Sequence, residues 1–244
     1  MECLQGSWEY ARTEETVLTK VIERLILLTT WLKKGQRVAS TESPVMVNLG
    51  SGLTVAPEWI HVDGSLNAMV SRLPKPLLKI LYRWSDNRQW FSCEQYVRIL
   101  TEHRFIHHRL QYGVPLGDNT VDVIYSSHAL EHIFLEEAQA LLQDAYRALK
   151  KGGLIRLAVP DLEHVLRLYQ SGSKEQALEF FFSRNRSGYL NHHHYMYDFE
   201  LLKNLLEKAG FVEVQRCGFR QGAMRDADKL DNRPEETLFV EARK

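Results

Sequence analysis

Three side chains that can exchange protons or bind a metal stand close together near the middle of the sequence. They are His128, Glu131 and His132, and at positions i, i+3 and i+4 they would share one face of a helix. Three consecutive histidines, residues 192–194, form a second group. These residue types suit proton transfer at a hydroxyl group or ligation of a divalent metal ion.

Three interpretations of the first cluster stay open. In a structural role, Glu131 and His132 would brace the helix and hold a neighbouring loop. In general base catalysis, a histidine with a near-neutral pKa would take the proton of an acceptor hydroxyl, and on this basis we predict His128 and His132 as catalytic residues. The third interpretation is a metal site, with His128, Glu131, His132 and a later histidine as its ligands. We rank this last and predict no tightly bound metal.

A glycine-rich loop and an acidic residue form a second chemical motif. Residues 48–52 read Asn-Leu-Gly-Ser-Gly after an apolar run, and Asp63 closes the next apolar run. Glycine lets a ligand approach the backbone closely, and a carboxylate in this place can accept hydrogen bonds from both hydroxyls of a ribose. The connection 53–58 is too short for a crossover helix and lacks the third glycine of a dinucleotide fingerprint, which favours a nucleoside ligand without phosphates.

Apolar runs alternate with helical patterns along the chain, which predicts a parallel, doubly wound α/β sheet with its ligand beyond the carboxyl ends of the strands. Asp198 is a predicted helix N-cap, and Gly152 and Gly210 are predicted helix ends. The predicted strands are residues 45–49, 59–63, 104–108, 121–125, 154–159, 211–217 and 237–242. The predicted helices are residues 17–32, 136–150 and the segment after Asp198.

The first predicted helix, residues 17–32, is the most apolar stretch of the chain. Charged residues interrupt it, so it is too short and too charged to span a bilayer. We predict that it packs over the domain, with a membrane-surface or lid helix as the alternative. Its apolar stripe is Val17, Val21, Leu25, Leu28 and Leu32.

The composition is that of a globular domain and argues against several other classes of protein. Of 244 residues, 44% are hydrophobic and 25% are charged, which is typical of a globular domain. Lysine and arginine balance aspartate and glutamate at 31 each, so no nucleic-acid partner is expected. The cysteines, Cys3, Cys93 and Cys217, are scattered, which argues against a disulfide framework or a cysteine zinc site. We see no export signal and expect a cytoplasmic protein without an integral membrane segment.

Six segments, in this order, resemble a known family: Val-Asn-Leu-Gly-Ser-Gly at 47–52, and residues 59–65, 121–132, 149–161, 196–202 and 230–242. They are similar to class I S-adenosylmethionine-dependent methyltransferases of a type 11-like bacterial branch. The resemblance covers residues 45–243. It implies a Rossmann-like class I methyltransferase fold, with a seven-stranded, mostly parallel sheet and helices on both faces.

The resemblance also implies S-adenosylmethionine as cofactor and a role for several residues. The glycine loop would face the methionine and ribose portions, Asp63 would hold the ribose, and residues 126–128 would line the sulfonium end. The implied cofactor-binding residues are Asn48, Gly50, Ser51, Gly52, Asp63, Leu110, Ser126, Ser127 and His128.

One position departs from the family pattern. Similar proteins often carry an acid that receives the adenine amino group, where this chain has Arg109. Because arginine is a donor only, it cannot accept from that amine. We expect Arg109 to turn outward, or toward Asp118 or Asp122, with backbone groups of residues 109–111 reading the adenine edge.

These observations predict an S-adenosylmethionine-dependent enzyme that O-methylates a small-molecule or glycan hydroxyl. The alternative is a non-catalytic methyltransferase-fold protein that binds a ligand or partner. We predict an N-terminal helix and linker at residues 1–44 and a methyltransferase-like domain at 45–244, with a helical insertion at about 66–104. Aromatic and arginine side chains within 66–102 and 180–189 are candidate walls of the acceptor site.

Overall fold

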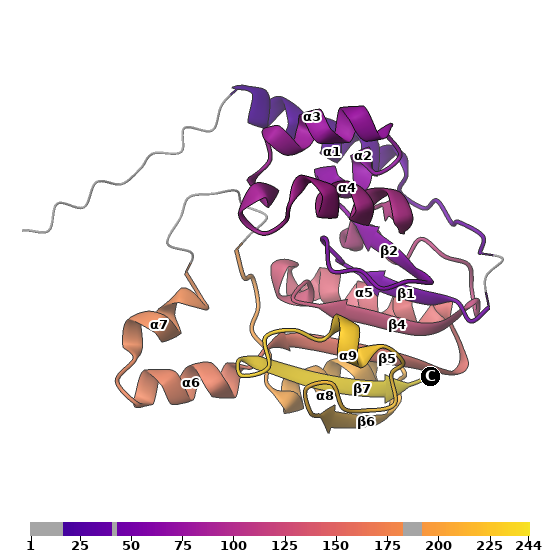
Figure 1. Ribbon diagram of the computed structural model, residues 1–244. Coiled ribbons are helices and arrows are strands. Elements are labelled where there is room, and N and C mark those ends of the chain that lie inside the picture. Colours follow the sequence, from indigo (N-terminus) through magenta and orange to yellow (C-terminus); the bar gives the residue numbers. More distant parts are fainter. Residues whose placement is uncertain (1–16, 41–42, 183–191) are drawn as a thin grey trace, which may run out of the picture.

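A single seven-stranded sheet organises the chain, in the order β3-β2-β1-β4-β5-β7-β6 (Figure 1). The computed structural model describes residues 17–40, 43–182 and 192–244. Strands β1 to β5 are parallel, whereas β7 runs antiparallel to both β5 and β6. This is the seven-stranded, mostly parallel sheet that the resemblance predicted. The strands are β1 Met46–Leu49, β2 Trp59–Asp63, β3 Arg104–His107, β4 Val121–Ser127, β5 Leu149–Pro160, β6 Val212–Cys217 and β7 Thr237–Arg243.

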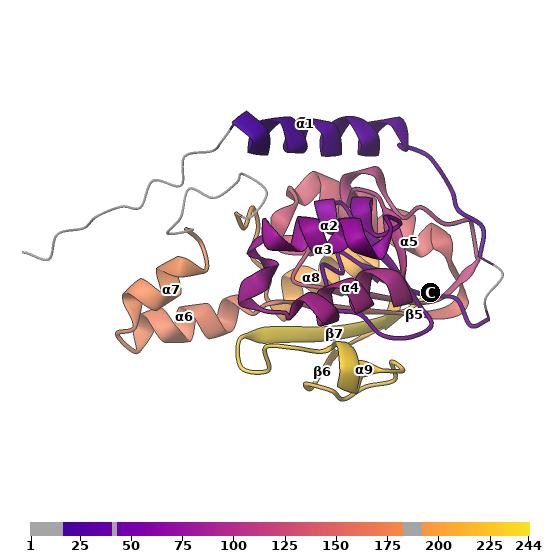
Figure 2. The ribbon, with the colours of Figure 1, turned by 45° about the horizontal axis from the view of Figure 1, so that its top comes forward.

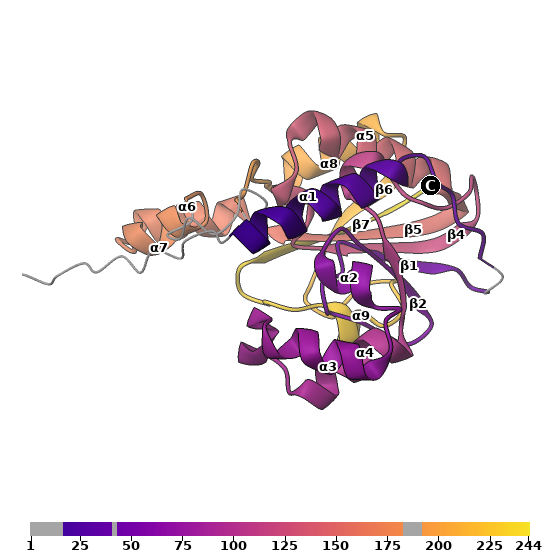
Figure 3. The same cartoon turned by 90° about the horizontal axis from the view of Figure 1, so that it is seen from above.

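Helices cover both faces of this sheet. In Figure 3, α5 and α8 lie on one face, and α3, α4 and α9 lie on the other. Helices α6 and α7 project beyond the carboxyl end of β5 (Figure 1). The helices are α1 Val17–Leu32, α2 Leu66–Val70, α3 Lys75–Arg83, α4 Cys93–Glu102, α5 Leu135–Ala148, α6 Leu162–Gln170, α7 Lys174–Glu179, α8 Phe199–Lys208 and α9 Ala227–Leu230; the 3-10 helices are η1 Asp86–Gln89, η2 Leu110–Tyr112 and η3 Leu130–His132.

The order of the strands fixes where a ligand can sit. Every residue of β1 and β2 is buried, as expected for parallel strands covered on both faces. From β1 the chain adds β2 and β3 on one side, and from β4 it adds β5 on the other side. The switch point therefore lies between β1 and β4, and the crevice beyond their carboxyl ends is the place where such sheets bind ligands.

Of the two glycines predicted to end helices, Gly210 does so and Gly152 does not. The Asp198 carboxylate accepts a hydrogen bond from the Leu201 N–H at 2.8 Å, which confirms the cap of α8, and Gly210 follows this helix with φ +103°. The prediction for Gly152 is wrong, because α5 ends at Ala148 and Gly152 lies within β5. The strand begins early because Leu149 already pairs with Val121 of β4.

The bounds predicted for α1 are confirmed, but its packing is not as predicted. Leu25, Leu28 and Leu32 are 48%, 52% and 67% exposed. The face that meets the domain is instead the one with Thr30, which is buried, and Thr29, whose hydroxyl lies 3.7 Å from the sulfur of Met69 on α2. Figure 2 shows the helix lying across one side of the molecule. None of the helices in the described ranges is long and apolar enough to cross a membrane.

The segment between β2 and β3 consists of α2, α3, η1 and α4. Its interior holds Tyr96, which is 2% exposed and donates from its hydroxyl to the Asn67 side chain, so Tyr96 belongs to a core and not to an acceptor wall. Trp84 and Trp90, by contrast, are 85% and 78% exposed. Most of the other candidate wall, residues 183–189, lies outside the described residues. The division of the chain at residue 44 stays a prediction.

Candidate cofactor and catalytic site

The carboxyl end of β1 and the glycine loop after it are bonded to both neighbouring strands at the switch point. The Gly50 N–H donates to the Val62 carbonyl at 2.8 Å, and the Ser126 hydroxyl donates to the Leu49 carbonyl at 2.9 Å. Gly50 has φ +68°, and a Cβ there would collide with the Cβ of Ala129. Only glycine therefore lets the loops after β1 and β4 approach this closely.

Asp63 ends β2 with its carboxylate turned toward the glycine loop. One oxygen accepts from the Gly52 N–H at 2.8 Å and the other from the Ser65 N–H at 2.7 Å. The residue is only 9% exposed. These two backbone contacts fix the carboxylate and tie it to the loop. Asn48 also stabilises this loop, because its buried side-chain amide donates to the Thr54 carbonyl at 3.0 Å.

The surroundings of Asp63 fit the ribose of a nucleoside. Each carboxylate oxygen keeps a lone pair after accepting one backbone hydrogen bond. A Cβ at Gly52 would meet no atom of the described residues within 4 Å, so this part of the loop is open. The buried hydroxyl of Ser65 also lacks a hydrogen-bond partner within the part of the chain that the structure describes. A polar ligand could donate hydrogen bonds to the Asp63 carboxylate, approach the backbone at Gly52 and pair with the Ser65 hydroxyl.

The segment that follows β3 lies beside Asp63. The His108 N–H donates to the Asp63 carbonyl at 3.0 Å, and the buried Leu110 side chain lies next to Gly50. Arg109 is half-buried, and its Nε donates to the Gln111 side chain at 3.2 Å. Of the two orientations predicted for Arg109, the one toward Asp118 or Asp122 is not the one found, since both carboxylates pair with other cations; the outward orientation stays a prediction. Asp118 pairs with Arg37 and Arg147, and Asp122 pairs with Lys150.

His128 follows β4 directly and has an unusual backbone. Its φ of +48° is rare for a residue with a side chain, and such conformations cluster at functional sites. Its N–H donates to the Ala158 carbonyl at 2.8 Å, and its Nε2 lies 2.9 Å from the Thr237 hydroxyl. Its Nδ1 lies 3.4 Å from a carboxylate oxygen of Glu131.

Glu131 is the centre of the histidine cluster. It is fully buried on η3, which holds Glu131 and His132 but not His128, so the three residues do not share the helical face that the spacing suggested. The Nε2 of His132 lies 3.9 Å from the same carboxylate oxygen that faces His128. Burial lowers the pKa of His132, and this effect outweighs the opposing effect of Glu131. His132 is therefore biased toward its neutral form.

One of the three consecutive histidines joins this cluster. The rings of His132 and His193 lie 4.9 Å apart, centre to centre. His194 instead stacks its ring on Phe134 at 4.3 Å. The backbone holds the segment in place, because the His194 N–H donates to the Glu131 carbonyl at 2.7 Å. The sequence left open which later histidine would approach Glu131.

Thr237 and Arg156 were missed by sequence reasoning. Thr237 begins β7 and reaches His128 across 109 positions of sequence. Arg156 is a fully buried cation in an apolar strand, which is a signal that the sequence did carry. It pairs with Asp231 and Glu241 and donates to two backbone carbonyls.

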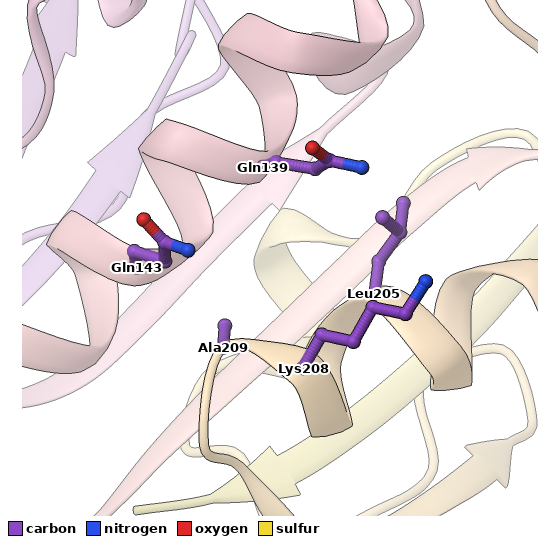
Figure 4. A pocket seen from close by; sticks show the side chains of 5 residues that line it. All are labelled: Gln139, Gln143, Leu205, Lys208 and Ala209. Atoms are coloured by element: carbon purple, nitrogen blue, oxygen red, sulfur yellow. The ribbon is translucent and has the colours of Figure 1, made fainter.

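A hollow on the helical layer lies apart from these residues. It is lined by Gln139 and Gln143 of α5 and by residues at the end of α8 (Figure 4). None of the lining residues comes from a loop at the carboxyl end of a strand. This hollow therefore lies apart from the switch point, where the residues predicted to bind the cofactor are found.

Comparisons with known proteins give a partial match to one protein family. A family model described as a methyltransferase domain matches residues 88–157, a segment that includes the His128 cluster. No match was found among curated protein sequences.

Several solved structures are similar to the chain. A methyltransferase from Archaeoglobus fulgidus has 15% identity and a TM-score of 0.47, with 92% of this chain and 94% of that chain covered. A possible histamine N-methyltransferase from Thermotoga maritima has 18% identity and a TM-score of 0.48, with 92% and 91% covered.

Proposed function

We propose that this chain, a class I S-adenosylmethionine-dependent methyltransferase in its fold and its matched domain, methylates a hydroxyl group of a small molecule or glycan. The observation that supports a hydroxyl acceptor is the His128–Glu131 pair beside the switch point. S-adenosylmethionine supplies a methyl group on a sulfonium, and its transfer to a hydroxyl oxygen leaves S-adenosylhomocysteine and a proton. The matched methyltransferase domain does not favour the non-catalytic alternative.

The residues proposed to hold the cofactor are those that the resemblance implied. Asp63 would accept hydrogen bonds from the ribose, and the loop at Gly50, Ser51 and Gly52 would pass close to the ligand. Leu110 would lie against the adenine, and residues 126–128 would border the reacting methyl group. Positioning of the acceptor can contribute about 7–11 kcal/mol to such a reaction, so holding both substrates in place is the main task of these residues.

His128 is the group best placed to take the proton. Nδ1 of His128 lies 3.4 Å from Glu131 and also 3.4 Å from the Arg233 guanidinium, which can only donate. The role proposed for His128 requires Nδ1 to keep its proton on the side of Glu131, so that the lone pair of Nε2 is the acceptor. Nε2 now faces the Thr237 hydroxyl, so a hydroxyl group can reach this edge of the ring. His132 is less suited, since its Nδ1 donates to the His192 carbonyl and its Nε2 faces Glu131.

Cofactor binding tests the proposed function directly. Calorimetry with S-adenosylhomocysteine should give saturable binding of about one ligand per chain, as expected for a single switch-point site. Absence of binding at millimolar ligand in a folded sample would favour the non-catalytic alternative.

We expect a His128→Gln variant to lose turnover without losing the cofactor. Removing a general base typically costs 10²–10⁴-fold, so kcat should fall by about that factor. S-adenosylhomocysteine binding should stay within about twofold, since the base contacts the acceptor. The measurement is S-adenosylhomocysteine release with a hydroxyl acceptor that the unmodified protein methylates. His103→Gln, at the amino end of β3, is the control. An unchanged kcat in His128→Gln would exclude the role as base.

A further inference from the structure

We propose that Glu131, His132 and His193 bind a divalent metal ion of the zinc type. Each residue offers one ligand atom, and these three atoms lie within 4.8 Å of one another. Two imidazoles and one carboxylate are ligands that zinc accepts in proteins. The site goes beyond methyl transfer, and metal binding does not depend on that function.

The first argument is an unsatisfied carboxylate. Glu131 is fully buried, and neither of its side-chain oxygens has a hydrogen-bond partner among residues 17–40, 43–182 and 192–244. The neighbouring imidazole nitrogens, at 3.4 Å and 3.9 Å, lie at ion-pair distances. A buried charge without hydrogen bonds is costly unless it is paired or coordinates a metal. A cation beside Glu131 would remove that cost.

The second argument is the hydrogen bonding of the two histidines. Nδ1 of His132 lies 3.2 Å from the His192 carbonyl, and Nδ1 of His193 lies 2.6 Å from the Phe180 carbonyl. A carbonyl can only accept, so each Nδ1 carries the proton and donates it. Each ring therefore keeps its lone pair on Nε2. Backbone carbonyls that fix the second nitrogen in this way are the usual surroundings of histidine metal ligands.

The geometry is that of an open site. Ligand atoms around tetrahedral zinc lie about 3.4 Å apart, given bonds of about 2.0–2.1 Å. The observed spacing of up to 4.8 Å is wider, so small side-chain rotations would close the site. Three protein ligands leave a fourth position for water or a substrate oxygen. Use of that position in methyl transfer, unlike metal binding itself, rests on the proposed function.

The ligand set differs from the one weighed from the sequence. There, His128 was a ligand, and no metal was expected. In the structure His193 is the later histidine that approaches His132, and Nε2 of His128 faces Thr237, which leaves Glu131, His132 and His193 as the ligand set.

Metal binding can be measured without activity. The protein is dialysed against a chelator and titrated with Zn²⁺ in competition with a chromophoric chelator, and the bound ion is counted by elemental analysis. We expect one Zn²⁺ per chain with micromolar or tighter affinity, and visible absorption bands with Co²⁺ in its place. Binding of less than about a tenth of an equivalent would overturn the proposal.

Variants separate this site from adventitious binding to histidines. His193→Gln should weaken Zn²⁺ binding at least tenfold, whereas His194→Gln, whose ring stacks on Phe134, should bind as the unmodified protein does. Glu131→Gln should also lose the ion, and His193→Gln serves if that buried variant fails to fold. Equal loss in the two histidine variants would contradict the site. Calorimetry of His193→Gln with S-adenosylhomocysteine distinguishes failure of the metal proposal from failure of the proposed function. Cofactor binding should persist in this variant, because the metal ligands are not proposed to hold the cofactor.

Discussion

In an Asp63→Ala variant, the dissociation constant for S-adenosylhomocysteine should rise at least tenfold. If Asp63 holds the ribose as proposed, the variant loses two charge-assisted hydrogen bonds, each worth about 1.5–3 kcal/mol, and about 1.4 kcal/mol is a factor of ten. It also loses the contact that ties the carboxylate to the Gly52 N–H and so loosens the loop. Calorimetry gives the dissociation constant, and thermal unfolding shows whether the variant is folded.

Asp63→Asn is the matched variant for this experiment. The amide keeps the size of the side chain but has one acceptor oxygen in place of two. Its affinity should therefore fall between those of the unmodified protein and the alanine variant. Asp86→Ala, on an exposed 3-10 turn, is the control for a lost carboxylate elsewhere. An unchanged affinity in folded Asp63→Ala would show that Asp63 does not hold the ribose.

An Arg156→Leu variant should lose about 3–5 kcal/mol of the free energy of unfolding, or fail to fold. Arg156 is fully buried between Asp231 and Glu241, which are 3% and 1% exposed. It also donates to the carbonyls of Gly218 and Gln221. Removing only the arginine would leave two buried carboxylates without their cation, and that is the costly way to break a buried ion pair.

An exposed ion pair in the same protein gives the control. Arg225 contacts Glu58 at 2.8 Å, but these side chains are 55% and 65% exposed. Arg225→Leu should therefore cost less than about 1 kcal/mol. Urea denaturation measures both variants, and Arg156→Lys, which keeps a charge but not the forked geometry, serves if Arg156→Leu is insoluble. Similar losses at Arg156 and Arg225 would refute the role of burial.

The sheet and its switch point were predictable from the sequence because both depend on local patterns. Apolar runs of the length of β1 and β2 have few alternatives to buried parallel strands. A glycine loop and a closing acid mark the carboxyl ends of those strands, and these ends must meet at one edge of the sheet. For the same reason the Asp198 cap of α8 was visible, since a capping residue acts within one helical turn.

Contacts between distant residues were not predictable. Gly152 has the local features of a helix end, but pairing of Leu149 with Val121 extends β5 instead. Arg109 donates to Gln111, whereas Asp118 and Asp122 form ion pairs with cations from other elements. The stripe of α1 is apolar at helical spacing, yet which face of the helix meets the domain is decided by α2 and not by the helix itself.

The burial of Arg156 limits how early the sheet can complete its folding during synthesis of the chain. Its carboxylate partners, Asp231 and Glu241, follow it by 75 and 85 positions in the chain. Strand β7 also lies between β5 and β6, so the sheet has a gap until residues 237–243 exist. A nascent chain that has reached α8 holds an unpaired arginine in the middle of the sheet. Folding of this sheet can therefore finish only after Glu241 has left the ribosome, however early the strands around the cofactor assemble.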